Sequence, residues 1–63
     1  MSVAPHVATP ERRVNDYTVV IEQGARDGLS EGDSVILAIG DEHVRSTVVD
    51  VTERKSVLEI NTA

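Results

Sequence analysis

The chain has 63 residues, no cysteine and a net charge of −5, from 11 acidic and 6 basic residues. Without cysteine there is no disulfide and no thiolate metal site, and an acidic chain of this kind is a poor binder of extended polyanions. One tyrosine is the whole aromatic content, which is too little for a stacking platform for single-stranded nucleic acid. No apolar run reaches the about 20 residues of a membrane helix, and the N-terminus lacks the basic and apolar regions of a signal peptide. We therefore expect a cytoplasmic protein with no membrane partner.

Residues 1–15 hold both prolines of the chain, Pro5 and Pro10. Proline fixes its φ angle and has no backbone N–H, so this stretch is expected to be neither a helix nor a central strand. We predict a flexible N-terminal arm over residues 1–15. Residues 16–63 are then expected to form a single small β domain.

Four runs rich in valine and isoleucine follow, at residues 17–22, 34–39, 43–52 and 56–60. β-branched side chains lose rotamer freedom in helices and pack well on a pleated sheet, so each run predicts a strand. Polar connectors at residues 40–42 and 53–55 have the length of hairpin turns. The pattern predicts an all-β fold, a small antiparallel β-barrel or β-sandwich of four to five strands.

Both faces of the predicted strands carry aliphatic side chains. Val19 and Ile21 share one face of the first strand while Val20 points to the other, whereas a strand with one wetted face would alternate cleanly between apolar and polar residues. One small barrel cannot shelter both sets, so we predict a homo-oligomer or a module docked on a larger protein. The alternative is a monomer with scattered exposed aliphatic residues, which small domains tolerate. The residues expected at the interface are Val20, Ile36, Val49 and Val51.

Glycines recur at positions 24, 28 and 32 between the first two predicted strands. Gly24 is expected to end a strand, Gly28 to close a tight turn, and Leu29 to plug one end of the core. A phosphate-binding glycine loop would have Lys-Ser or Lys-Thr after its last glycine, whereas Asp33 stands there and repels phosphate. The segment is therefore interpreted as a structural turn, formed by Gly24, Asp27, Gly28, Leu29, Gly32 and Asp33.

The spacing of this turn is similar to that found in several small β-barrel modules, and it runs Ile21-x-x-Gly24-x-x-Asp27-Gly28-Leu29-x-x-Gly32-Asp33-x-Val35. It most resembles the C-terminal β-module of flagellar assembly protein T, and the β-domain of the rod-shape protein MreC carries a similar turn. The resemblance covers about residues 17–60 and implies a non-catalytic module that serves protein–protein assembly. The expected partners are further copies of the chain and a larger protein.

A second resemblance points to another class of protein. Residues 29–35, with the strand and Gly-Asp turn that follow, are similar to the AbrB-type swapped-hairpin transcription factors, which dimerise and present arginines to DNA. That resemblance implies phosphate contacts from Arg12, Arg13 and Arg45. DNA binding is kept as the alternative function, although ten of the 11 acidic residues follow position 13 and oppose it.

The two histidines, His6 and His43, are the first candidates for chemistry. His43 follows Asp41 and Glu42, but adjacent residues at a hairpin tip rarely converge on one metal ion. No nucleophile elbow accompanies a serine, and so short a β chain offers little room for a substrate cleft. We predict no enzymatic activity, no metal site and no cofactor.

Overall fold

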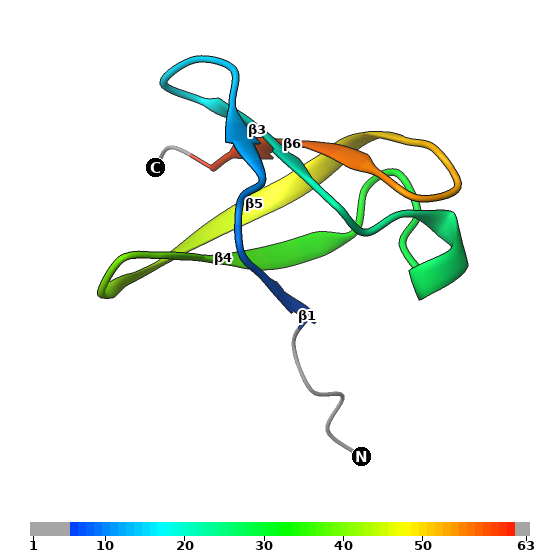
Figure 1. Cartoon of the computed structure of the whole chain (residues 1–63), viewed down its shortest axis with the longest axis horizontal. Coiled ribbons are helices and arrows are strands. Elements are labelled where there is room, and N and C mark those ends of the chain that lie inside the picture. The colour runs from blue at the N-terminus through cyan, green and yellow to red at the C-terminus, as the bar shows by residue number, and fades with distance from the viewer. Residues whose placement is uncertain (1–5, 62–63) are drawn as a thin grey trace.

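The computed structural model describes residues 6–61 of the chain. Its strands form one mixed sheet in the order β1-β4-β5-β6-β3-β2, and the sheet curls around its own inner face like part of a barrel (Figure 1). The elements are β1 (His6–Ala8), β2 (Arg12–Arg13), β3 (Thr18–Ile21), η1 (Ala25–Asp27), β4 (Ser34–Ile39), β5 (Glu42–Val51) and β6 (Ser56–Ile60). The all-β prediction is confirmed, but the sheet has six strands rather than four to five and is mixed rather than purely antiparallel.

Two antiparallel hairpins, β4–β5 and β5–β6, form the middle of the sheet. In the first, Ile39 pairs with Glu42, which leaves Gly40 and Asp41 as the turn. Gly40 has a φ of 60°. A two-residue hairpin turn of type II′ requires a positive φ at its first position, which glycine adopts readily. The sheet does not close, so β1 and β2 are its two edges.

The concave inner face of the sheet holds the core. Side chains alternate along a strand, and accordingly every second residue of β3 and of the first part of β4 is buried. Leu29 reaches into this core from the loop after η1 and closes one end of it. The buried apolar residues are Ala8, Val19, Ile21, Leu29, Val35, Leu37, Val48 and Leu58.

Nothing covers the outer face of the sheet among the described residues, because the only helical element there is the short 3-10 turn η1. None of the helical structure in residues 6–61 has the length and apolar character that crossing a membrane requires. Over residues 6–61, the outer face is therefore open for binding.

A bulge in β5 changes which face the end of that strand presents. The pairing of β5 with β6 shifts between Val48 and Asp50, which leaves Val49 as an extra residue. An extra residue moves the alternation of side chains by one position. Val51 consequently packs against the core. The expectation that Val51 lies outward, at an interface, is wrong for this reason.

Strands β1 and β2 correct the predicted domain boundary. β1 pairs in parallel with β4, and β2 pairs antiparallel with β3, so residues 6–13 belong to the sheet rather than to a separate arm. Residues 1–5 lie outside the described residues. Pro10 is compatible with this arrangement because it lies in the connection between two edge strands, where its missing N–H breaks no central ladder.

Two serines are buried on the inner face among the aliphatic residues, and both hydroxyls have partners. The Ser46 hydroxyl donates to the Val35 carbonyl at 2.8 Å, and the Ser56 hydroxyl donates to the Gln23 carbonyl at 2.6 Å. A buried hydroxyl without a partner would cost free energy. These two hydrogen bonds therefore let polar residues sit in the core of the sheet.

Replacing Ser46 with alanine is expected to lower the free energy of unfolding by about 1 kcal/mol, because the Val35 carbonyl loses a donor at a buried position. Urea denaturation measures the change. The control is Ser34→Ala, at an exposed serine of the neighbouring strand, which is expected to stay within about 0.5 kcal/mol of the wild type. Equal losses in the two variants would show that the Ser46 hydrogen bond contributes no stability.

Candidate functional site: the outer face and a basic cleft

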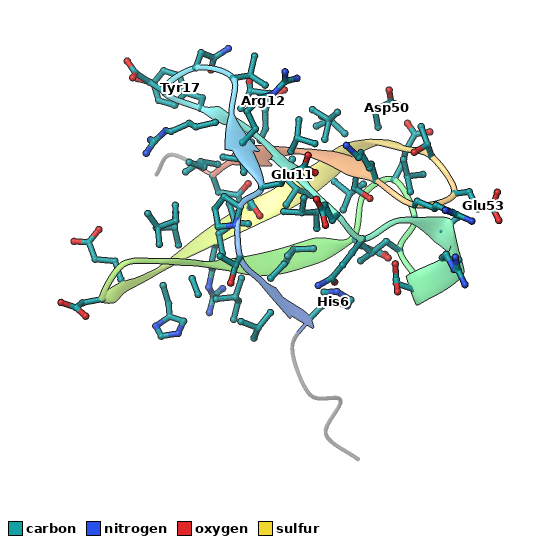
Figure 2. All side chains as sticks on the ribbon, in the orientation of Figure 1. His6, Glu11, Arg12, Tyr17, Asp50 and Glu53 are labelled. Carbon is teal, nitrogen blue, oxygen red and sulfur yellow. The ribbon has the colours of Figure 1, made fainter. Side chains whose placement is uncertain are left out.

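A row of four residues crosses the outer face through β2, β3, β6 and β5. Arg12 pairs with Val20. On its other side Val20 pairs with Val57 of β6, and Val57 pairs with Asp50 of β5. Neighbouring strands are about 4.8 Å apart, so the row spans about 14 Å. Two valines are thus flanked by a guanidinium at one end and a carboxylate at the other, and Figure 2 shows Arg12 and Asp50 on the same side of the sheet. We call these four residues the Arg12–Asp50 row.

Exposed apolar side chains lie beside this row. Val49, the extra residue of the bulge next to Asp50, is 40% exposed. Val14 is 52% exposed. Its backbone N–H donates to the Thr18 carbonyl at 2.9 Å, so Val14 lies two residues along the chain from Arg12, on the same side of the hairpin. Tyr17, at the tip of the same β2–β3 hairpin, is 57% exposed. The apolar surface around the row is therefore larger than its two central valines.

Ile36 belongs to a different part of the outer face. It pairs with Val7 on one side and with Arg45 on the other, and Val7 is 49% exposed. Two strands, β5 and β6, separate β4 from β3, and polar residues occupy the outer face between them at Thr47 and Glu59. The predicted interface residues thus divide into Val20 and Val49 near the row, Ile36 beside Val7, and Val51 in the core.

The three arginines implied for DNA contact do not form one surface. Arg12 lies on the edge strand β2, and Arg45 lies on β5, three strand positions away in the sheet. Arg13 is engaged locally, since its guanidinium Nη2 donates to the Asp16 carbonyl at 2.9 Å. Asp50 adds a carboxylate to the same face. The fold therefore disperses these arginines and places negative charge among them.

Backbone hydrogen bonds hold the loop around η1 against the β5–β6 hairpin. The Ala25 N–H donates to the Thr52 carbonyl at 2.8 Å, and the Arg26 N–H donates to the Glu53 carbonyl at 3.0 Å. Gly24 makes this approach possible, because a Cβ at that position would collide with the backbone of residues 52–55. We call residues 24–28 and 52–55 together the double loop.

The remaining residues of the predicted structural turn shape the chain between η1 and β4. Gly28 and Gly32 have φ angles of 92° and 91°, in the left-handed region that favours glycine. Leu29, between them, packs in the core. The Asp33 carboxylate accepts a hydrogen bond from the Ser30 N–H at 2.8 Å. Gly28, Leu29, Gly32 and Asp33 therefore stabilise the turn and its packing on the core.

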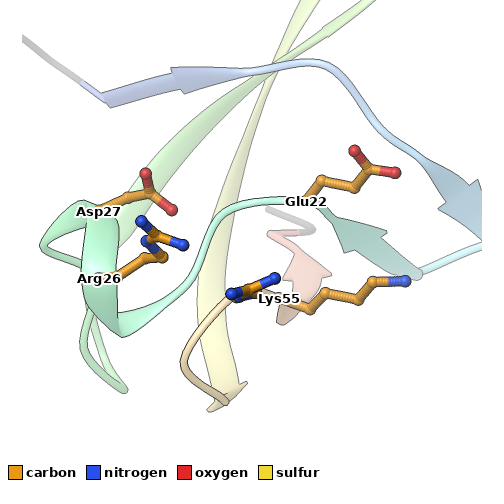
Figure 3. Close-up of a pocket in the computed structure, with 5 residues that line it drawn as sticks. Glu22, Arg26, Asp27 and Lys55 are labelled. Carbon is orange, nitrogen blue, oxygen red and sulfur yellow. The ribbon is translucent and has the colours of Figure 1, made fainter.

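A cleft of about 420 Å³ opens beside the double loop (Figure 3). Three of its five side chains are cationic and two are carboxylates. The Asp27 carboxylate already accepts a hydrogen bond from the Gly24 N–H at 3.0 Å. The lining residues are Glu22, Arg26, Asp27, Arg54 and Lys55.

Sequence reasoning missed this cleft. Arg26 and Arg54 stand in two loops that are distant in the sequence, and no motif or spacing links them. The only local signal is the pair Arg54-Lys55 at a predicted hairpin turn. The two loops meet because β3 pairs with β6, which is a long-range pairing that the local pattern does not specify.

Neither histidine lines the cleft or belongs to the Arg12–Asp50 row. The Nε2 atom of His6 is hydrogen bonded to the side-chain oxygen of Gln23, and His43 is an exposed residue of β5 opposite Ala38. Over residues 6–61, no three side chains of the metal-binding types come close enough to hold an ion.

The fold defines a small all-β protein built on one curled, mixed sheet. Comparison of the chain with protein-family models, with curated proteins and with solved structures finds no match. The resemblance to the flagellar and MreC modules therefore stays a prediction, and function is argued from the residues of this chain.

Proposed function

We propose that this protein is a non-catalytic assembly module that self-associates through the Arg12–Asp50 row. The observation that supports this is the order of the row: a cation, two valines and a carboxylate. When two copies pack face to face about a two-fold axis parallel to the strands, the order is reversed in the second copy. Arg12 then faces Asp50 of the second copy, and Val20 faces its Val57, with each contact made twice.

The contact is expected to be small and reversible. The row lies on the outer face of a curled sheet (Figure 1), so burial is confined to the two valines and their neighbours Val14 and Val49. Such a contact falls below about 1,200 Å², in the size range of transient complexes. Apolar burial supplies the attraction, while the charge pairs select the orientation. A larger protein that presents the same order of groups would dock on the same row.

DNA binding is not adopted as the function, since Arg12 and Arg45 lie on strands far apart in the sheet. Phosphate contacts strengthen one another when the cations follow the nucleic acid backbone. Here Asp50 lies on the same face as Arg12, and its carboxylate would repel that backbone.

Charge reversal at the ends of the row tests the proposal. In sedimentation equilibrium, Arg12→Glu and Asp50→Arg are each expected to weaken self-association at least about tenfold, because each brings like charges together. The double variant Arg12→Glu/Asp50→Arg restores opposite charges across the contact and is expected to recover wild-type association. The control is Arg45→Glu, which makes the same charge change on the outer face away from the row.

The single variant Asp50→Arg and the double variant are read together. The double variant restores the net charge of −5 as well as the opposite charges across the contact, so its recovery alone does not separate the two effects. Asp50→Arg adds two positive charges to an acidic chain and would strengthen association if net charge alone acted, so weaker association in Asp50→Arg with recovery in the double variant indicates that Arg12 and Asp50 meet between copies. A double variant that associates as weakly as either single variant would contradict the proposed interface, and so would an equal loss with Arg45→Glu.

A further inference from the structure

We propose that the cleft beside the double loop binds the phosphate group of a phosphomonoester, held between the guanidinium groups of Arg26 and Arg54. This site is separate from the Arg12–Asp50 row and does not depend on self-association. Its two arginines come from the two halves of the double loop. Guanidinium groups match the geometry of phosphate oxygens and bind them with paired hydrogen bonds.

The frame that carries the two arginines is fixed by the backbone. Besides the two hydrogen bonds that join the halves of the double loop, the Thr52 N–H donates to the Lys55 carbonyl at 2.8 Å and closes the hairpin. Gly24 packs so closely on this hairpin that a Cβ there would lie 2.7 Å from the Lys55 backbone nitrogen. A rigid support of this kind reduces the ordering cost of binding.

The two guanidinium groups are available for a ligand. Among residues 6–61 the one ion pair joins the Lys55 amine to the Glu11 carboxylate at 3.1 Å, so neither Arg26 nor Arg54 has a carboxylate partner there. Figure 3 shows the Lys55 side chain extending away from Arg26. The Asp27 carboxylate is held by the Gly24 N–H at 3.0 Å. The cleft therefore holds two guanidinium groups without an ion-pair partner in the described part of the chain, and its three cations outnumber its two carboxylates in a chain whose net charge is −5.

The backbone N–H groups in the η1 half of the double loop are already engaged in hydrogen bonds. The N–H groups of Ala25 and Arg26 donate across the double loop, and those of Asp27 and Gly28 donate to the carbonyls of Gly24 and Ala25. This turn therefore has no free amides to form a phosphate cradle of the glycine-loop type. The proposed site is therefore built on the side chains of Arg26 and Arg54.

A single compact anion fits this setting better than a polymer. The rest of the surface is acidic and repels an extended polyanion such as duplex DNA. One phosphate group needs only the local excess of positive charge, and its two charges favour it over a carboxylate between two arginines. The carboxylate of Glu22 at the cleft limits the affinity, so we expect a dissociation constant in the millimolar range for phosphate itself.

Titration of the full chain with inorganic phosphate, followed by amide NMR shifts, tests the site. Sodium chloride at matched ionic strength is the reference. We expect saturable shifts at residues 24–28 and 52–55, and about tenfold weaker binding in Arg26→Gln and in Arg54→Gln, since each removes charge-assisted hydrogen bonds. The control Arg45→Gln is expected to bind like the wild type. Unchanged shifts elsewhere check that each variant keeps the fold.

Two results would overturn the site. One is that phosphate causes no saturable amide shifts beyond the shifts that sodium chloride causes. The other is that Arg45→Gln weakens phosphate binding as much as Arg54→Gln does. The same titration with glycerol phosphate and with a phosphoserine peptide then identifies the source of the phosphate group. Tighter binding of glycerol phosphate indicates a small molecule, and tighter binding of the peptide indicates a modified protein. Tighter binding of a DNA duplex, dependent on Arg45, would instead mean that the chain binds polyanions. A variant that loses phosphate binding and keeps normal self-association shows that this site is independent of the Arg12–Asp50 row. A variant that loses self-association and keeps phosphate binding shows the same.

Discussion

Gly24→Ala is expected to lower the free energy of unfolding by about 3 kcal/mol, which is at the upper end for overpacking a tightly packed site. A Cβ at this position would collide with the Thr52 carbonyl and would lie 2.7 and 2.8 Å from the backbone nitrogens of Lys55 and Arg54. All three are backbone atoms, so no side chain can rotate away to make room. The two halves of the double loop must separate, and the hydrogen bonds between them weaken together.

Urea denaturation of Gly24→Ala and Gly28→Ala gives the matched comparison. A Cβ at Gly28 meets no atom within 4 Å, but its φ is 92°, and a left-handed residue with a side chain costs about 1 kcal/mol. Gly24→Ala is therefore expected to be clearly the more damaging of the two. If Gly24→Ala were as stable as Gly28→Ala, the close contact between the two loops would not exist in solution.

The second large effect is expected from Leu58→Ala, with a loss of about 3 kcal/mol. Leu58 is fully buried, at 0% exposure, and it pairs with Val19 on one side and with Val48 on the other. Truncation leaves a cavity at the centre of the inner face that rigid strand backbones cannot close. A domain of this length has about 3–9 kcal/mol of stability, so this loss removes at least about a third of it.

Val57→Ala, one residue earlier on the same strand, is the control for Leu58→Ala. Val57 faces outward and is half-buried, so its truncation is expected to cost less than about 1 kcal/mol. Thermal unfolding at low protein concentration measures both variants without a contribution from self-association. Equal losses would contradict the assignment of the inner face as the core.

Local sequence patterns predicted the middle of the sheet well. The runs 34–39 and 56–60 coincide with β4 and β6, because turns rich in polar residues and glycine bound each run sharply. β1 and β2 were not predicted as strands, since they are short and lack a β-branched run, and they are strands only because β4 and β3 offer them edges. The bulge at Val49 was also not predicted, and it reversed the predicted face of Val51.

The candidate sites were less accessible to sequence reasoning than the fold. Alternation along a strand places Val20 and Ile36 opposite the core residues, but it does not say which outward residues become neighbours. Val20 meets Val57 through the pairing of β3 with β6, and Asp50 joins them only because the bulge shifts the register. The cleft likewise depends on two loops brought together by long-range pairing. In both cases the missing information is the order of the strands.

The most direct test of self-association through the Arg12–Asp50 row is an NMR experiment on a mixture of isotope-labelled and unlabelled chains, filtered for contacts between different copies. At millimolar concentration we expect cross-peaks between the methyl groups of Val20 in one copy and Val57 in another. Cross-peaks from Val7 and Ile36 in their place would move the interface to the other end of the sheet. No cross-peaks between copies, together with a monomeric mass at that concentration, would contradict self-association altogether.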